Sequence, residues 1–460
     1  MTIDLSASIA VTRFGLGARP GEIDRARANP REFLLAQIRP AGALQPQPAA
    51  PNSAQRLSEL RDYQRDRKQA RQSGDPKSDP VMMFAKLLRQ DTAQDFLARA
   101  RLAATTSDGF AERWALFWAN HFTVSAVKGD TATLVGPFEQ EAIRPHVFGR
   151  FEDMLVASTK HPAMLLYLDQ AQSVGPGSFL AQKAALNQAA HIPGLNENLG
   201  REIMELHTVG VDAGYTQADV TEFARALTGW SLGRLDHPEE PRGFMFRPYA
   251  HEPGARLIMG RRYAQDGEAQ ARAVLGDLAA DPHTARHLAT KIARHFVSDT
   301  PSQVLTNQLA KAFETNGGRL DEVARALIAS PEAWVPAGTK FKTPYEFLVS
   351  SWRAADAPPT DIAAIAHAMT ILGQRPFSAP SPKGWPEDAQ AWCAPDSVIK
   401  RMAWSESFAA QSVAEQDPIV LAQNALGARL TPAVSAAVSR AETRAEGFSI
   451  LLMSPEFQRR

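Results

Sequence analysis

The sequence has a single cysteine, Cys393, and this scarcity excludes several classes of site. One thiol cannot form an intramolecular disulfide, and it cannot build the thiolate-rich zinc or iron–sulfur centres that need several cysteines. The chain also lacks an uninterrupted apolar run long enough to cross a bilayer, so no membrane span is expected.

An excess of charge of one sign is also missing, because 50 Lys and Arg residues balance 50 Asp and Glu residues. Proteins that bind nucleic acids usually carry a basic surface. The most basic stretch, residues 61–72 (RDYQRDRKQARQ), is interrupted by aspartates and is typical of a solvated helix. Nucleic acid is therefore not expected as a partner.

Several catalytic templates are absent from the sequence. It has no GxSxG nucleophile elbow, no GxxxxGK[ST] phosphate loop and no HExxH zinc motif. Nucleotide hydrolysis therefore has no support from the sequence.

Apolar residues recur at helical spacing along most of the chain, and the breaks between these segments contain proline or glycine. Strand signals are confined to residues 242–263, where a Pro-Gly turn separates two short apolar runs. We therefore expect a mainly α fold: a large multi-helix bundle-like body with one small β-hairpin-like insertion or structured loop.

The length of 460 residues is compatible with one large domain or with two. We expect a single α-helical domain over residues 1–460, and two lobes, 1–232 and 233–460, are the alternative. Proline- and alanine-rich segments flank a polar helix within residues 39–80, so this region is predicted to be an exposed arm or linker.

The segment Asn196–Trp230 concentrates the polar chemistry of the chain in and after one amphipathic helix. Glu197, Arg201 and Glu205 follow one another at i,i+4 spacing. Such a ladder stabilises a solvated helix by about 0.2–0.5 kcal/mol per pair and needs no substrate. A paired surface ladder is therefore one interpretation of this helix.

A functional interpretation rests on Glu202, which has no basic residue at i±3 or i+4. Glu202 and Glu205 are close enough on a helix to share a cation or to act as an acid–base pair. The predicted catalytic set is Glu202, Glu205, His207 and Arg201. His207 joins it only if the helix ends before Gly210, since on a straight helix it points away from both glutamates.

Two further histidines complete the predicted centre, His121 at the end of an aromatic helix and His251 in the 242–263 loop. Carboxylates and imidazoles on facing helices hold iron, manganese or zinc in helical bundles. The predicted metal ligands are His121, Glu202, Glu205 and His251, with Asn198 and Asn120 orienting the bound group. The alternative for both histidines is a hydrogen-bonded structural role.

Seven short segments, together with 196–230, carry a family resemblance. They are RFGLGARP (13–20), FWANHFTVS (117–125), PAMLLYLD (162–169), HEPGARLIMG (251–260), KIARHFVSDTP (291–301), KTPYEF (342–347) and LGQRPFSAPSPKGWP (372–386). In these segments the chain resembles the bacterial domain-of-unknown-function 1800 family.

The resemblance implies a mostly helical fold. It also implies a partner, a phosphatase- or sulfatase-like protein of the domain-of-unknown-function 1501 family that is frequently encoded beside it. Two hypotheses follow: a metal-dependent enzyme acting on an envelope-related or polymeric substrate, or a non-catalytic partner or maturation protein for that neighbour. The first residues are not typical of a signal peptide, so a cytoplasmic protein is expected, with export alongside a folded partner as the alternative.

Overall fold

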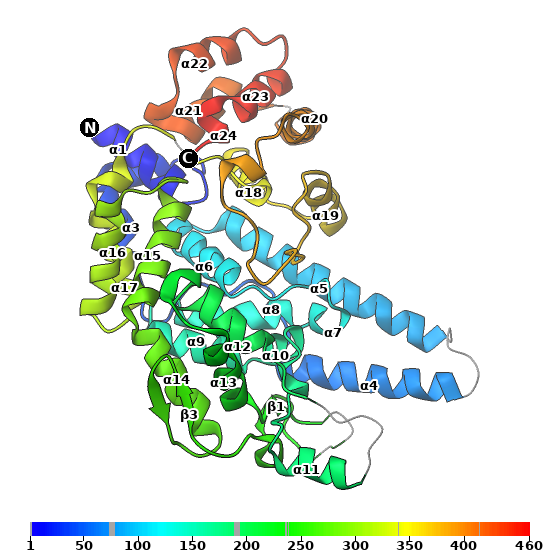
Figure 1. Ribbon diagram of the computed structural model, residues 1–460. Coiled ribbons are helices and arrows are strands. Elements are labelled where there is room, and N and C mark those ends of the chain that lie inside the picture. Colours follow the sequence, from blue (N-terminus) through cyan, green and yellow to red (C-terminus); the bar gives the residue numbers. More distant parts are fainter. Residues whose placement is uncertain are drawn as a thin grey trace.

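The computed structural model describes residues 2–72, 79–187, 194–234, 237, 239–338, 340–413 and 415–460. Helices dominate these residues, and two small antiparallel sheets are the only paired strands among them, as Figure 1 shows. The predicted mainly α fold is confirmed. None of the helices in the described ranges combines the length and the apolar character that a transmembrane segment requires.

The first half of the chain builds one end of the molecule, the arm and the centre. Its helices are α1 (Ile3–Ile9), α2 (Glu22–Arg27), α3 (Pro30–Leu35), α4 (Ser53–Gln72), α5 (Asp79–Thr105), α6 (Gly109–His121), α7 (Gly129–Ala132), α8 (Val135–Phe138), α9 (Phe151–Lys160), α10 (Pro162–Tyr167), α11 (Phe179–Leu186), α12 (Asn198–Glu202) and α13 (Gln217–Leu227).

The second half returns along the first, so that the C-terminal helices lie beside the N-terminal ones (Figure 1). Its helices are α14 (Glu268–Ala280), α15 (Pro282–Phe296), α16 (Gln303–Thr315), α17 (Leu320–Ala329), α18 (Pro344–Ala354), α19 (Ile362–Ile371), α20 (Pro395–Ser412), α21 (Pro418–Leu426), α22 (Pro432–Ser439), α23 (Arg444–Met453) and α24 (Pro455–Gln458).

Proline is abundant in this helical chain, 32 residues in all, because it often begins a helix instead of interrupting one. A side chain that caps the helix then precedes a proline in the first turn, where the missing N–H has no intrahelical role. This pattern starts the helices at Pro30, Pro162, Pro282, Pro344, Pro418, Pro432 and Pro455.

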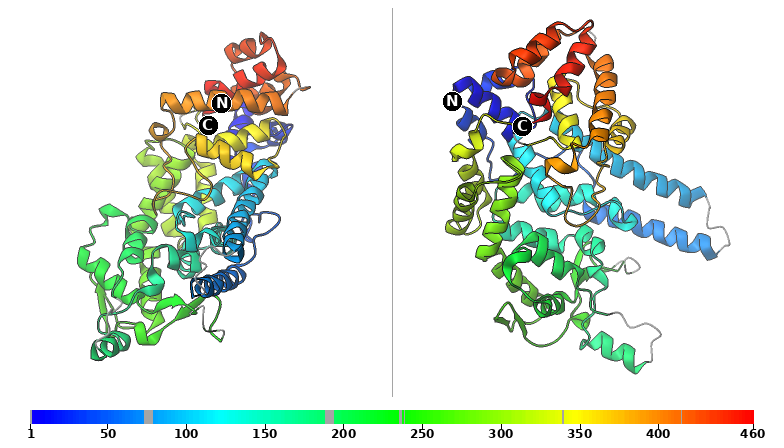
Figure 2. Two further views of the ribbon diagram at one scale, coloured as in Figure 1. Left: turned by 90° about the vertical axis from the view of Figure 1, so that its right-hand side faces the viewer. Right: turned by 45° about the horizontal axis from the view of Figure 1, so that its top comes forward.

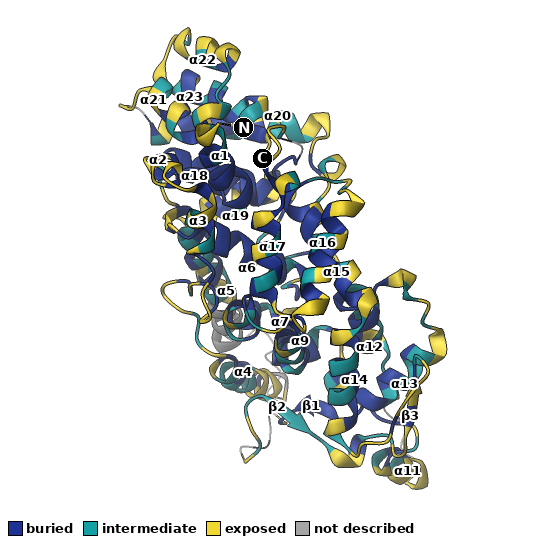
Figure 3. Cartoon of the chain, turned by 90° about the vertical axis from the view of Figure 1, so that its left-hand side faces the viewer, coloured by how far each residue is buried: buried dark blue, intermediate teal, exposed yellow. Residues whose placement is uncertain are grey.

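The core is centred on α6, whose apolar face was apparent in the sequence. Trp114, Phe117 and Trp118 are buried, and Trp114 packs against Phe148 and Phe296 from other parts of the chain. One continuous hydrophobic cluster extends from α1 to α24. Figure 3 shows that α18 is buried, whereas exposed residues gather on outer helices such as α22.

The 242–263 segment forms strands, but its two apolar runs do not pair with each other. The first run, β2 (Phe244–Phe246), pairs with β1 (Trp230–Leu232), and the second, β3 (Arg256–Ile258), pairs with β4 (Arg261–Tyr263). The tight turn of the second hairpin lies at Met259 and Gly260, both with positive φ, and not at the Pro-Gly turn.

The predicted arm at 39–80 has two different parts. Residues 39–53 are attached to the body, because Ala43 N–H donates to Arg144 O and Ser53 N–H donates to the Glu141 carboxylate. Helices α4 and α5 then project from the body as a hairpin, which Figures 1 and 2 show from three directions. Residues 73–78 lie outside the described part of the chain.

A buried ion pair ties the start of the chain to α18. The Arg353 guanidinium donates to both Glu22 carboxylate oxygens, at 2.9 and 2.8 Å, and to the carbonyls of Gly17 and Thr106. Both side chains are at most 1% exposed. Removing one partner of such a pair is costly, because the other charge stays buried without compensation.

We predict that Glu22→Gln lowers the free energy of unfolding by about 3 kcal/mol, since it leaves the Arg353 charge buried without a counter-ion. Urea denaturation followed by tryptophan fluorescence measures the change. Asp24→Asn is the matched control on the same helix, because Asp24 pairs with Arg27 on the exposed surface and should contribute less than about 1 kcal/mol. Equal losses in the two variants would contradict the prediction.

Candidate functional site

The helix at 196–207 ends as the functional interpretation required, but it directs His207 elsewhere. Regular α12 stops at Glu202 and continues as a π-helical turn, Ile203–His207, which closes when Gly210 N–H donates to Met204 O. The extra residue in a π turn changes the direction of the side chains that follow it. His207 is therefore buried against the ring of Phe122.

Half of the predicted carboxylate ladder forms. Glu197 accepts hydrogen bonds from Arg201 at 3.1 Å, from Gln217 at 2.8 Å and from Thr221 at 2.6 Å. Arg201 also donates to Gln217, and no ion pair joins it to Glu205 within the described residues. Arg201 and Glu197 therefore join α12 to α13, which is a structural role.

Glu202, the last residue of α12, and Glu205, in the π turn that follows, are both half-buried. Burial and the neighbouring Glu205 raise the pKa of Glu202, and Arg201 opposes this shift. The pKa of Tyr167 rises to about 12, through burial and the charge of Glu202. The charge of Glu205 therefore acts on Glu202, and Glu202 in turn lies near Tyr167.

His121 lies with His207 and Lys291 in an apolar pocket of aromatic rings. Its Nε2–H donates to His207 O at 3.1 Å, and its Nδ1 accepts from Lys291 Nζ at 2.9 Å. Burial, Lys291 and the nearby histidines hold the pKa of His121 well below 6.5, so the ring is neutral. Burial also lowers the pKa of Lys291 to about 8.

His251 and Asn198 lie apart from that cluster. His251 Nδ1 donates to Thr228 O at 2.8 Å, and its ring stands against Phe246. Asn198 is exposed, and its backbone N–H is bonded to the Asn196 side chain. Two other histidines hold structural positions: His161 caps α10, and His287 is bonded to Leu206 O.

The four residues predicted as metal ligands do not gather around one point. In the described ranges, the only group of three or more His, Cys, Asp or Glu residues with ligand atoms that close together is His237, Glu239 and Glu240. That group lies on the surface, where Arg234 pairs with Glu240. Both ring nitrogens of His121 are already bonded within the protein, so a shared ion at the predicted centre does not fit this arrangement.

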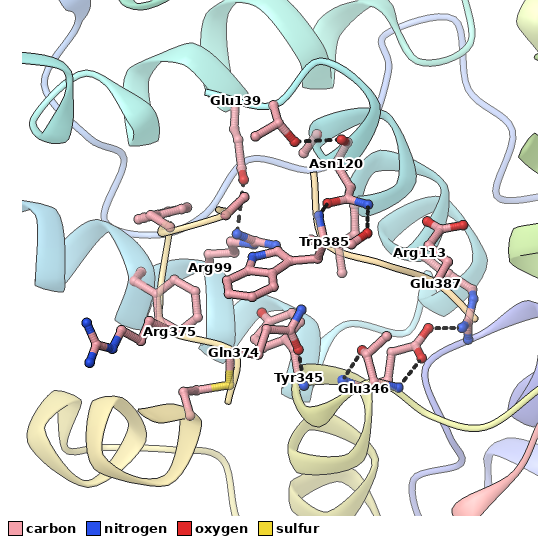
Figure 4. A pocket seen from close by; sticks show the side chains of 18 of the residues that line it. Arg99, Arg113, Asn120, Glu139, Tyr345, Glu346, Gln374, Arg375, Trp385 and Glu387 are labelled. Carbon is pink, nitrogen blue, oxygen red and sulfur yellow. Dashed lines mark hydrogen bonds and ion pairs between the residues drawn. The ribbon is translucent and has the colours of Figure 1, made fainter. Parts of the chain in front are cut away.

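The structure instead brings five of the quoted segments to a central cavity of about 110 Å³. Residues from 13–20, 117–125, 291–301, 342–347 and 372–386 line it, although they are distant in the sequence. Figure 4 shows the polar members of this lining around Trp385. The volume is enough for a few water molecules or a small chemical group.

Asn120 closes this cavity by holding the loop that covers it. Its amide donates to Trp385 O at 3.0 Å and accepts from Trp385 N–H at 2.8 Å, so both the nitrogen and the oxygen of the amide are hydrogen-bonded to Trp385. Gly384, with φ +85°, passes so close that an added Cβ would lie 2.5 Å from Asn120 O. Only glycine fits there, and Asn120 therefore positions the loop.

A buried charge network forms one wall of the cavity. Glu346, the capping-box residue of α18, pairs with Arg113 of α6 and with Arg460 at 2.9 Å. Burial raises the pKa of the Glu346 carboxyl, but Arg460 and Arg113 outweigh it, and the net pKa lies below 4.5. Glu346 is therefore ionised at neutral pH.

His295 and Glu387 form a hydrogen-bonded dyad in the same wall. His295 Nδ1 lies 2.8 Å from Glu387 Oε1, and both residues line the cavity. Burial lowers the pKa of His295, with Glu387 opposing, while His295, Lys340 and Lys291 hold the pKa of Glu387 below 4.5 against burial. A neutral imidazole beside a carboxylate donates its Nδ1–H, which leaves Nε2 unprotonated.

Five polar atoms of the lining have no hydrogen-bond partner within the described protein: His295 Nε2, the Tyr345 hydroxyl and the Nε atoms of Arg99, Arg113 and Arg460. His295 and Tyr345 are at least nine-tenths buried, and buried polar groups nearly always have a partner, whether protein, water or ligand. On the far wall, Arg99 pairs with Glu139 at 3.0 Å and stacks over Tyr345. The cavity thus presents a base and a hydroxyl, while Arg99, Arg113 and Arg460 are paired through the terminal nitrogens of their guanidinium groups.

Residues 9–459 match the family model described as "Protein of unknown function (DUF1800)". The chain belongs to this family. No curated protein and no solved structure matches it.

The quoted segments mark where the cavity lies in the sequence, but they do not show which of its side chains interact. Tyr345, Glu346 and Glu387 lie in or beside quoted segments, yet nothing adjacent in sequence marks them as interacting. His295 lies on α15, far in the sequence from Glu387. One sequence feature could have indicated these interactions: charged residues such as Arg113 and Glu346 stand within otherwise apolar helices. Such residues are rarely buried without a partner.

We predict that mild acidification lowers the free energy of unfolding, because the histidines are buried in their neutral form. Burial, Lys291 and His287 lower the pKa of His207 to about 3 in the folded protein, against 6.5 ordinarily, so the unfolded chain binds the proton first. The stabilisation is complete above pH 6.5 and is lost as the pH falls towards 3. We expect the unfolding free energy of His207→Phe to depend less on pH between 6.5 and 4, by up to about 1.4 kcal/mol per pH unit.

Urea denaturation at pH 7.5, 6, 5 and 4 measures these slopes. His367→Phe, at an exposed position on α19, is the control and should follow the parent protein. A slope unchanged by His207→Phe would show that His207 does not carry this pH dependence.

Proposed function

We propose that this protein is an enzyme whose substrate places a reacting group in the central cavity, with His295 as general base. The observation that carries the proposal is the dyad: His295 Nδ1 is held by Glu387 at 2.8 Å, and Nε2 has no protein partner in the described chain. A base of this kind must be neutral and oriented before it can accept a proton.

Each neighbouring residue has a part in this proposal. Glu387 fixes the tautomer of His295 and stabilises the imidazolium after proton uptake, as carboxylates do in catalytic triads. Tyr345 offers a hydroxyl for a hydrogen bond to the substrate. Asn120 holds Trp385 over the cavity and so limits access of water, which strengthens electrostatic interactions inside.

The reaction class is proton abstraction from a water molecule or from a substrate hydroxyl. The carboxylate–histidine centre expected from the sequence is thus proposed at His295 and Glu387. An envelope-related or polymeric substrate stays a prediction, and in that case only one small group of the polymer would enter a cavity of about 110 Å³.

A non-catalytic role is the second candidate, as a partner or maturation protein for a phosphatase- or sulfatase-like protein. The observation that favours it is the α4–α5 hairpin, which projects from the body and exposes much of its surface (Figures 1 and 2). In this case the cavity would be structural.

Metal dependence also stays a prediction. Metal analysis of untagged protein by plasma mass spectrometry, beside Glu202→Gln and His251→Ala, tests it. Near-stoichiometric metal that is lost in both variants would support an ion at the predicted ligands, by a rearrangement that brings them together.

We predict that His295→Ala abolishes turnover and that Glu387→Gln reduces it by about 10²–10⁴-fold, the usual contribution of general-base catalysis. The measurement is untargeted mass spectrometry of a cellular metabolite extract incubated with each purified protein. Compounds consumed by the parent should persist with both variants.

His283→Ala is the matched control, because His283 is an exposed residue of the same helix α15 and should leave turnover unchanged. Thermal denaturation checks that each variant is folded. Consumption by His295→Ala at the parent rate would overturn the proposed base, and an extract unchanged by the parent protein would favour the non-catalytic candidate.

A further inference from the structure

A second hollow, of about 680 Å³, lies at the base of the α4–α5 hairpin and is separate from the chemistry of the dyad. Three helices each turn one face towards it, since their lining residues recur at helical spacing. These residues are Leu60, Tyr63 and Arg67 of α4, Arg89, Thr92 and Ala93 of α5, and Ile362, Ala366 and Thr370 of α19. We call this hollow the hairpin groove.

Small residues and one loop complete the hairpin groove. Ala126, Gly129 and Ala132 form its floor without filling it, and residues 375–378 form one end. Arg375 and Phe377 line both the groove and the central cavity, so the two spaces share this wall. Figure 4 shows the Arg375 guanidinium pointing away from the residues of the cavity.

The charge of the lining has one sign. Arg67, Arg89 and Arg375 contribute guanidinium groups, and no Asp or Glu is among the described residues that line the groove. Arg67 and Arg375 form no ion pair within the described chain, although most arginines nearby do; Arg65, for example, pairs with Asp62 at 3.2 Å. The remaining lining is mainly apolar, with Leu60, Phe377 and Ile362.

The volume and the chemistry of the groove together indicate which class of ligand it can bind. Its volume falls in the range of roughly 300–1,000 Å³ typical of small-molecule sites. A protein partner needs a larger surface, about 800 Å² on each side for a stable complex. An apolar lining that ends in arginines matches a ligand with an apolar chain and an anionic head, because guanidinium groups bind carboxylates in paired hydrogen bonds.

We propose that the hairpin groove binds a single-chain amphipathic carboxylate. The chain lies between the faces of α4, α5 and α19, and the carboxylate pairs with Arg67 and Arg375. This site goes beyond the proposed enzymatic function and does not depend on it, since none of the dyad residues line the groove.

Isothermal titration with dodecanoate, below its micellar concentration, tests the proposal directly. We expect one site per chain, and about tenfold weaker binding in Arg67→Ala and in Arg375→Ala, the loss expected for a charge-assisted hydrogen bond. Arg65→Ala is the matched control on the same helix and should bind as the parent does. Dodecanol, which has the chain without the charge, should bind at least tenfold more weakly than dodecanoate.

A variant that fills the groove separates specific binding from general adsorption. Ala366 is half-buried on α19, and Ala366→Trp should abolish the dodecanoate signal while circular dichroism stays that of the folded parent. The proposal is overturned if dodecanoate does not bind, if it binds Ala366→Trp, Arg67→Ala or Arg375→Ala as tightly as the parent, or if dodecanol binds equally well.

Discussion

The centre of this molecule depends on the ion pairs that the Glu346 carboxylate forms. It caps α18, pairs with Arg113 on α6 and pairs with Arg460 of the last segment, so three distant parts of the chain meet at one buried charge. Because a buried carboxylate is tolerated only when it is fully paired, the three elements must assemble together. Their assembly defines one wall of the central cavity and brings Arg460 to the backbone of His295.

The helical fold was predictable because it depends on local signals. Apolar spacing predicted helices along most of the chain, and the aromatic helix expected before His121 forms as α6 with its aromatic face buried. The pairing of the β-strands was less predictable. Packing decides which short strands pair, and the two runs on either side of the Pro-Gly turn do not pair with each other. Residues 39–53 looked like a linker because they contain little to bury, but backbone and polar side-chain contacts attach them to the body, and composition does not reveal such contacts.

The site was predicted only in part, for a physical reason. A helical wheel separates the faces of one helix, and it correctly placed Glu202 beside Glu205. It cannot show the π turn that redirects His207, nor the contacts between elements that join His295 to Glu387 across 92 positions. Side chains that act together from different elements leave no spacing in the sequence. The quoted segments pointed to the right regions, and only the folded chain showed how they meet.

The protonation state of His295 is the most direct test of the account, because it needs no substrate. Histidine labelled with ¹⁵N, assigned through His295→Ala, reports which ring nitrogen carries the proton at pH 7. We predict a neutral ring with hydrogen on Nδ1 and an unprotonated Nε2, and a disturbed pattern in Glu387→Gln. A ring protonated on Nε2 at neutral pH, or one indifferent to Glu387, would contradict the proposal that the dyad prepares His295 as a base.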